Sequence, residues 1–228
     1  MAKFLAAILL AGAVAVPKGC SISFGSGSTN PAAPSSVVLK VPFFMQQEEL
    51  SCGPAAIEMW AAYDGLSATQ QEIGSYIGCG ANGSTSPGQI VAGVQHFTAS
   101  GRDATLEYNG GVGDPATIAG TFYSAEITSI TALVPSIPLV NGATHAVVLT
   151  GGDWHIDADS GLYVWDLVAF NDPAIGPRTL DAGSWTGYDD TQHVISAAAS
   201  AQAYENYMQN RSKIAISGSG LGGKPLPY

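Results

Sequence analysis

Cys52 is the residue in this sequence best suited to act as a nucleophile. It stands between Ser51 and the pair Gly53-Pro54, at the start of a helix that the apolar spacing predicts from Pro54 to Tyr63. The backbone N–H groups and the dipole at a helix N-terminus stabilise a thiolate, which is the reactive form of cysteine. The alternative is a small buried residue that happens to begin a helix, so the interpretation depends on a base elsewhere in the chain.

His145 is the histidine that we expect to serve as that base. It opens the apolar strand pattern "HAVVLTG", so it stands on a rigid element that can face a helix end. Of the other histidines, His96 falls within a predicted helix, His155 in a polar turn and His193 in a late segment. A base that takes the thiol proton, with a third polar group that fixes the imidazole ring, would activate Cys52.

Asp172 is the candidate for that third group. It ends the next predicted strand, within "AFNDP". Two adjacent antiparallel strands joined by a turn bring the start of the first beside the end of the second, so Asp172 can reach the His145 ring. Asn171 alternates to the opposite face and is the less suitable partner. A turn built on Asp172 and the proline after it is the alternative role.

Two glutamines before Cys52 are candidates for a further function. Acyl transfer needs donors for the developing oxyanion, commonly the backbone N–H of the nucleophile and one side chain. Gln46 and Gln47 precede Cys52 by six and five residues, and either can reach back if the intervening loop folds over. The spacing alone does not choose between them.

Three predicted helices position the first part of this site. After the helix that follows Cys52, two more begin at S-x-x-Q capping boxes. Ser67 with Gln70 predicts a helix to about Ile77, and Ser86 with Gln89 predicts one to about Thr98. The second box has proline at the first helical position, which favours a helix start.

Strands predominate in the second part of the chain. A strand at "SVVLKVPFF" precedes Cys52, another is expected at "ATLEYNGG", and a short helix runs from Asp114 to Tyr123. Three further strands follow at "PSIPLVNG", "HAVVLTGGDW" and "GLYVWDLVAFNDP", and a last helix is expected over residues 196–213. Helices first and then an antiparallel sheet predict the α+β class.

Composition excludes some functions. The chain has 228 residues, of which 46% are hydrophobic, enough for a real core. Its formal net charge of −10 gives no electrostatic reason to bind nucleic acid. Asp153, Asp157 and Asp159 faintly resemble a calcium loop, but the bidentate glutamate is missing and a hairpin turn fits better. We therefore expect no metal and no cofactor.

The N-terminus has the layout of an export signal. Lys3 precedes the apolar run "FLAAILLAGAVAV", which predicts a signal peptide over residues 1–19 and an exported protein, periplasmic, secreted or held at the cell surface. A hydrophobic core helix is the alternative. Cys20 would be the site of a lipid anchor if the signal is of the lipoprotein type, and this anchor is the expected route to a membrane. Residues 20–37 form a flexible linker of Ser, Gly and Pro.

Three cysteines leave an odd thiol in an exported chain. If Cys20 is removed or lipidated, Cys52 and Cys79 remain. A disulfide between them is the structural alternative to a nucleophilic Cys52.

Taken together, "QQEELSCGPAAIEMW", "THAVVLTGGDW" and "VAFNDP" resemble the papain-like cysteine peptidases. They are most similar to the bacterial peptidases that cut leader peptides after a double glycine, as in bacteriocin processing. The resemblance implies that Gln46 helps to bind the oxyanion, Cys52 attacks, His145 acts as base and then acid, and Asp172 orients His145. In this chain "ATH" replaces the usual glycine before the histidine, and the region after Asp172 has no counterpart.

The resemblance implies a papain-like domain over residues 38–215, with a helical half packed on an antiparallel sheet, and a Gly-rich tail over 216–228. A catalytic Cys52 stays unpaired, which leaves Cys79 as a free thiol or a partner of Cys20. The expected function is a monomeric cysteine peptidase acting on peptide or protein substrates. An acyltransferase or amidase on the same scaffold, and a catalytically inactive surface binding protein, are the alternatives.

Overall fold

The structure, a computed structural model, describes residues 35–79, 84–108, 115–157, 163–188 and 192–196. The chain divides into two compact units, Met1–Ala33 and Pro34–Tyr228, and every described residue belongs to the second. The expected signal peptide and the tail lie outside the described residues, as does the expected last helix apart from its first residue. No helix among the described residues has both the length and the apolar character needed to cross a membrane.

Three helices form the first part of the fold. They are α1 Cys52–Tyr63, α2 Gln70–Ile77 and α3 Pro87–Phe97. The capping box predicted for α3 is present, because Ser86 accepts from the Gln89 N–H and the Gln89 side chain accepts from the Ser86 N–H. Helix α1 is buried along most of its length, so it forms the centre of the helical layer.

The capping box predicted for α2 is wrong by two residues. Thr69, not Ser67, caps the helix, and Glu72 at the third helical position closes the box with a 2.8 Å hydrogen bond from the Thr69 N–H to Glu72 Oε2. Gln70 is the first helical residue instead of the closing one, and it is 5% exposed. Its side chain is therefore engaged elsewhere in the fold.

The strands form two four-stranded antiparallel sheets, where one was expected. Sheet A has the order β1-β5-β6-β7, with β1 Ser36–Val38, β5 Val148–Ile156, β6 Tyr163–Asp172 and β7 Gly176–Asp181. Sheet B has the order β2-β8-β3-β4, with β2 Ala104–Tyr108, β8 Gln192–Ser196, β3 Ile137–Val140 and β4 His145–Ala146. The split arises because "HAVVLTGGDW" contributes to both sheets, as β4 and then as β5.

Two further helices pack on the sheets. Helix α4 spans Pro115–Thr131 and contacts β6 and β8, and α5 spans Ala182–Tyr188 and contacts β6 and β7. Helix α4 was predicted to end at Tyr123. It continues because Ile127 and Ile130, one helical turn apart, are both buried in the core.

The flexible linker was predicted to reach residue 37, and this boundary is also wrong. Ser36–Val38 pair with Gly151–Asp153 of β5, and the Trp154 N–H donates to the Ser35 carbonyl over 2.8 Å. The pairing is close because β5 has two glycines there: a Cβ on Gly151 would lie 1.9 Å from the Val37 carbonyl oxygen. Residues 35–37 therefore belong to the fold, and the strand predicted from Ser36 is present over Ser36–Val38.

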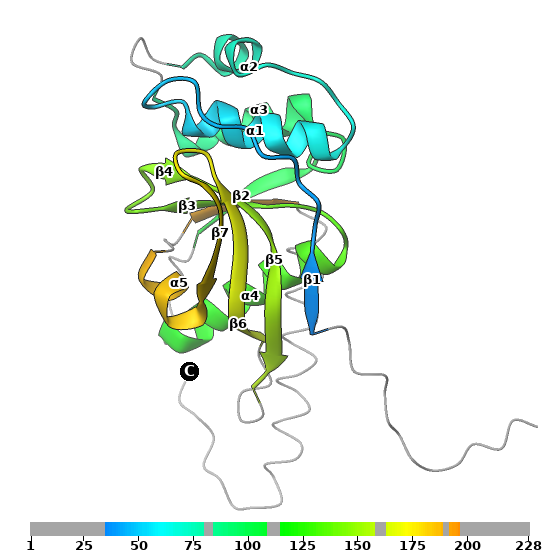
Figure 1. Ribbon diagram of the computed structural model, residues 1–228, viewed down its shortest axis with the longest axis vertical. Helices are drawn as coiled ribbons and strands as arrows, with labels where there is room; N and C mark the ends of the chain where they lie inside the picture. Colours follow the sequence, from blue (N-terminus) through cyan, green and yellow to red (C-terminus); the bar gives the residue numbers. More distant parts are fainter. Residues whose placement is uncertain (1–34, 80–83, 109–114, 158–162, 189–191, 197–228) are drawn as a thin grey trace, which may run out of the picture. The chain divides into compact units, whose positions relative to one another are not determined.

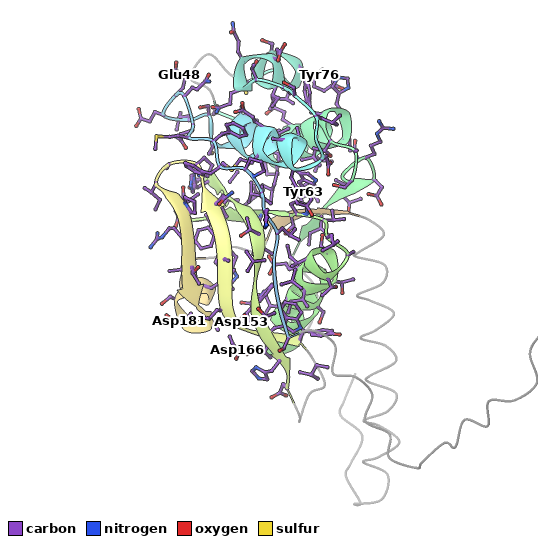
Figure 2. All side chains as sticks on the ribbon, turned by 45° about the vertical axis from the view of Figure 1, so that its right-hand side comes forward. Glu48, Tyr63, Tyr76, Asp153, Asp166 and Asp181 are labelled. Atoms are coloured by element: carbon purple, nitrogen blue, oxygen red, sulfur yellow. The ribbon has the colours of Figure 1, made fainter. Side chains whose placement is uncertain are left out.

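Helices α1, α2 and α3 lie at one end of the strands, so that β4 and the β6–β7 turn point at the start of α1 (Figure 1). Figure 2 shows Glu48 at this end, with Asp153, Asp166 and Asp181 at the opposite end of sheet A. Helices and antiparallel sheets occupy distinct layers, which confirms the predicted α+β class.

Candidate active site

Cys52 is the first residue of α1, where the fold leaves backbone N–H groups without intrahelical partners. The N-cap residue Ser51 makes no side-chain bond to the helix. Its hydroxyl instead donates to the Glu48 carbonyl and accepts from the Glu48 N–H, both at 2.9 Å. Ser51 therefore closes the loop before Cys52, and the N-terminal groups of α1 remain available to the sulfur.

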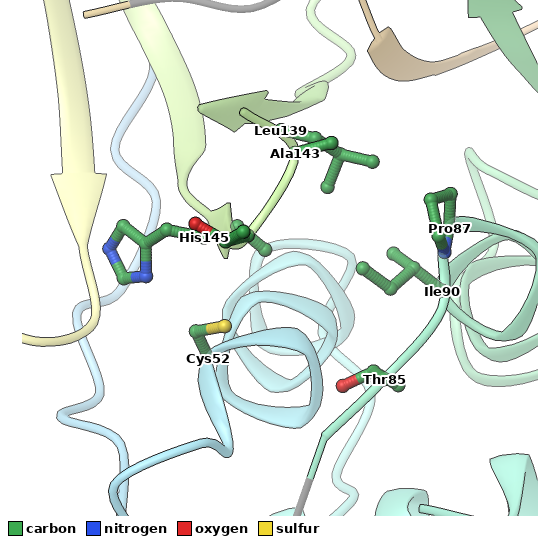
Figure 3. Close-up of a pocket in the computed structure, with 9 residues that line it drawn as sticks. Cys52, Thr85, Pro87, Ile90, Leu139, Ala143 and His145 are labelled. Carbon is green, nitrogen blue, oxygen red and sulfur yellow. The ribbon is translucent and has the colours of Figure 1, made fainter. Parts of the chain in front are cut away.

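Position 53 is suited to glycine because the segment that contains Thr85 packs directly on the backbone there. A Cβ at this position would lie 2.6 Å from Thr85 Oγ1 and 3.1 Å from Thr85 Cβ. Figure 3 shows Thr85 facing the start of α1. A side chain at position 53 would therefore require Thr85 or the start of α1 to shift.

His145 is placed by a tight turn between β3 and β4. Asn141, Gly142 and Ala143 all have positive φ, at 55°, 72° and 58°. For a residue with a side chain this left-handed conformation costs about 1–2 kcal/mol. Thr144 closes the turn through its hydroxyl, which donates to the Asn141 carbonyl over 2.7 Å. The turn directs the His145 side chain to Cys52 (Figure 3).

Asp172 lies beside His145, as the strand pattern predicted. His145 Nε2 is 2.8 Å from Asp172 Oδ1, and the carboxylate side chain is 3% exposed. The Ala174 N–H also donates to Oδ1 over 2.9 Å, which fixes the carboxylate. Asn171 points away and donates to the Val41 carbonyl. Since Asp172 occupies Nε2, Nδ1 is the imidazole nitrogen left for Cys52.

Cys52 and His145 shift each other's proton affinity. Burial raises the pKa of the Cys52 thiol, but hydrogen bonds from His145 and the Ala146 N–H, the charge of His145 and the Gly53 N–H together lower it below its ordinary value. Burial lowers the pKa of His145, yet the hydrogen bonds and charges of Asp172 and Cys52 raise it to about 9. Both shifts act in the same direction, because each favours the charged form of its group, the thiolate of Cys52 and the imidazolium of His145.

We expect Asp172→Asn to lower the pKa of His145 from about 9. The amide keeps an oxygen near Nε2 but removes the negative charge that favours the imidazolium, while the burial that lowers the pKa remains. NMR titration of the His145 ring measures the shift, with the His155 resonance as the internal reference. If His145 still titrates near 9 in the variant, Asp172 does not set its charge.

Gln46 and Gln47, the two candidate oxyanion donors, lie in different surroundings. Gln46 Nε2 donates to the Glu48 and Glu49 carbonyls at 3.0 and 2.6 Å, and its Oε1 is buried without a partner among the described residues. Gln47 is exposed and lines a separate cavity beside α2. The Gln46 side chain must rotate out of its loop to donate to an oxyanion, so this role remains a prediction.

A small pocket adjoins Cys52 and His145. Its volume is about 20 Å³, little more than the roughly 10–15 Å³ that one water requires on the same measure. Mostly small or rigid side chains close it: Thr85, Pro87, Ile90, Leu139, Ala143, Thr144 and Ala146. The pocket directly beside the sulfur is therefore small.

The remaining candidates lie outside this constellation. Cys79 and Cys52 are both free thiols, so the alternative of a disulfide between them is wrong. His96 stacks on Tyr76 with ring centroids 3.9 Å apart, and His155 is 2.9 Å from Asp166. No group of three or more metal-binding side chains occurs among the described residues.

The helix N-terminus was predicted to supply backbone donors to the sulfur, but nothing in the sequence indicated the Ala146 N–H or the polar wall of the pocket. The Ala146 N–H acts on Cys52 because it directly follows His145, a position that side-chain patterns do not reveal. Thr85 precedes the capping residue of α3. The glycine at position 53 was the signal in the sequence that another segment packs closely on the start of α1.

A model of the Peptidase_C39 like family matches residues 38–213. No curated protein matches the sequence significantly. One similar solved structure is a double glycine motif protease from an AMS/PCAT transporter in complex with the leader peptide, at 19% identity and a TM-score of 0.47, covering 70% of this chain and 95% of that one. Another is a C39-like peptidase from Bacillus anthracis, at 12% identity and a TM-score of 0.45, covering 70% and 96%.

Proposed function

Since the chain belongs to the Peptidase_C39 like family, as its motifs predicted, we propose that it is a cysteine peptidase that uses Cys52, His145 and Asp172. The observation that carries this proposal is the arrangement of the three side chains: a thiol of lowered pKa at a helix start, an imidazole of raised pKa, and a buried carboxylate 2.8 Å from that ring. These are the parts that nucleophilic acyl transfer requires.

In the proposed reaction the Cys52 thiolate attacks the carbonyl carbon of a peptide bond. The His145 imidazolium gives its Nδ1 proton to the leaving amine as the C–N bond breaks, which leaves a thioester on Cys52. His145, now neutral, takes a proton from water, and the hydroxide attacks the thioester. Loss of the thiolate then releases the carboxylic acid product, and Asp172 holds the ring throughout.

The oxyanion would bind at the start of α1. As the first residue of α1, Cys52 has a backbone N–H without an intrahelical acceptor, which would donate to the oxyanion. We assign the second donor to Gln46, after rotation of its amide. In the resting conformation the Gln46 amide uses its Nε2 in the loop while its Oε1 has no partner among the described residues, so one of its two polar atoms is not yet used.

The small pocket limits the substrate. The cavity beside Cys52 and His145 is small, about 20 Å³, and favours small side chains. We propose that residues immediately before the scissile bond are Gly, Ala or Ser. This size filter agrees with the resemblance to peptidases that cut after a double glycine.

Product analysis tests the proposal and separates it from the acyltransferase alternative. The purified full chain is incubated with a peptide library, with and without a primary amine at high concentration, and the products are identified by mass spectrometry. We expect free carboxylic acids after small residues, with the amine product in the minority. Exclusive transfer to the amine would favour the transferase, and intact peptides would overturn the peptidase proposal.

A further inference from the structure

Gln70, at the start of α2, makes hydrogen bonds to the backbone on both sides of Gln46. The Gln47 N–H donates to Gln70 Oε1 over 2.9 Å, and Gln70 Nε2 donates to the Met45 carbonyl over 2.9 Å. The carboxamide thus pairs with residues 45–47 as a peptide group of a neighbouring strand would. Gln70 is 5% exposed, so water does not compete strongly for these bonds.

The other side of the same segment is attached to the sheet half of the fold. The Gln46 N–H donates to the Pro173 carbonyl over 3.0 Å, and Pro173 directly follows Asp172. In an extended segment the N–H of one residue points away from the N–H of the next. Residues 45–47 are therefore held from two sides, by Gln70 of α2 and by Pro173 after β6.

The second N–H of the Gln70 amide connects residues 45–47 to α1, the helix that carries Cys52. Gln70 Nε2 donates to Glu58 Oε2 over 2.8 Å, and Glu58 lies on α1, which begins at Cys52. One carboxamide therefore joins α2, α1 and the segment that carries Gln46. Both of its N–H groups and its oxygen are used.

We infer that Gln70 is a positioning residue for oxyanion stabilisation: it fixes the backbone about which the Gln46 side chain rotates, relative to the helix that carries Cys52. The inference rests on the proposed function, because it assigns the geometry of that same site. It predicts an effect on the turnover step, where the oxyanion forms, and little effect on substrate binding.

Only an amide can make this set of bonds. A carboxylate at position 70 accepts from the Gln47 N–H but cannot donate to the Met45 carbonyl, and it would repel Glu58. Exchanging the two groups in the double variant Gln70→Glu/Glu58→Gln restores a donor–acceptor pair between α1 and α2. It leaves only the Met45 carbonyl without its donor.

The test compares kcat and KM for peptide hydrolysis in full-length variants. We expect Gln70→Ala to lower kcat about tenfold, part of the roughly 10²–10³-fold cost of losing an oxyanion donor, with KM within about twofold. Gln71→Ala, which changes the exposed neighbour on α2, is the matched control and keeps wild-type kcat. Gln70→Glu should lose at least as much kcat as Gln70→Ala, and the double variant with Glu58→Gln should recover part of it.

Two further measurements distinguish a positioning role of Gln70 from a general disruption of the active site. Alkylation of Cys52 by iodoacetamide forms no oxyanion, so its rate should be unchanged in Gln70→Ala. In a Gln46→Ala background Gln70→Ala should lower kcat little further, because both changes act on the same donor.

Several outcomes overturn the inference. A wild-type kcat in Gln70→Ala, an equal loss of Cys52 alkylation, or a full additional loss of kcat on top of Gln46→Ala would each exclude the positioning role while leaving the peptidase proposal intact. A wild-type chain that hydrolyses no peptide overturns the proposed function, and the assignment of Gln70 with it.

Discussion

Replacing Cys52 with alanine is expected to abolish peptide hydrolysis, with kcat falling on the order of 10⁶-fold or to the background rate. The sulfur forms the covalent bond to the substrate, and no other group in the site can substitute for it. Alanine is smaller than cysteine and fits the buried start of α1, so the fold should persist. Steady-state hydrolysis of a peptide with small residues before the scissile bond measures the loss.

Cys79→Ala is the matched control for this variant. Cys79 is a free thiol, and burial raises its pKa, so it is a poor nucleophile at neutral pH. Activity should survive its removal. Full activity in Cys52→Ala, or loss of activity in Cys79→Ala with Cys52 intact, would show that the wrong thiol has been assigned.

Replacing His145 with alanine is expected to lower kcat/KM by about 10²–10⁴-fold, the usual contribution of a general acid–base. The same change should raise the pKa of Cys52. The hydrogen bond and the charge of His145 are lost, while the burial that raises the pKa remains. The thiolate is then scarce at neutral pH and forms only in alkaline solution.

Alkylation of Cys52 across a pH series separates these effects. In the wild type the midpoint of the rise should lie below the ordinary pKa of a thiol. In His145→Ala the rise should move to higher pH, so labelling is slower at neutral pH and recovers in alkaline solution. His155→Ala, which changes a histidine at the far end of sheet A, should keep the wild-type profile. If the pH dependence of Cys52 alkylation is unchanged in His145→Ala, the imidazole of His145 does not set the pKa of the thiol.

Much of the site follows from local patterns that the fold preserves. Gly-Pro after Cys52 predicted a helix start, and the structure begins α1 at Cys52. The alternation in "VAFND" placed Asp172 and Asn171 on opposite faces, and only Asp172 contacts His145. These predictions succeeded because helix caps and strand alternation depend on neighbouring residues, which a sequence displays directly.

The capping box at Ser67 and Gln70 failed for a tertiary reason. The S-x-x-Q pattern is satisfied in sequence, but Gln70 has stronger partners in Met45, Gln47 and Glu58. The helix therefore starts at the next suitable cap, Thr69. Thr69 with Glu72 is a second local match to the capping box, and the pattern alone does not choose between the two.

The region after Asp172 was also beyond local patterns. Strand β7 is mostly exposed, so "GPRTLD" lacks the apolar alternation that marks a half-buried strand. Strand β8 forms by pairing with β2 and β3, which lie far away in the sequence. The number of sheets depends on these distant pairings.

The three proposed catalytic side chains come from three separately built elements: Cys52 from α1, His145 from sheet B and Asp172 from sheet A. Contacts between segments this far apart form late in folding, because chain closure opposes them until much of the structure exists. Before that stage Cys52 is an ordinary thiol, mostly protonated at neutral pH. A lowered pKa of Cys52 would therefore indicate that both sheets have already packed against the start of α1.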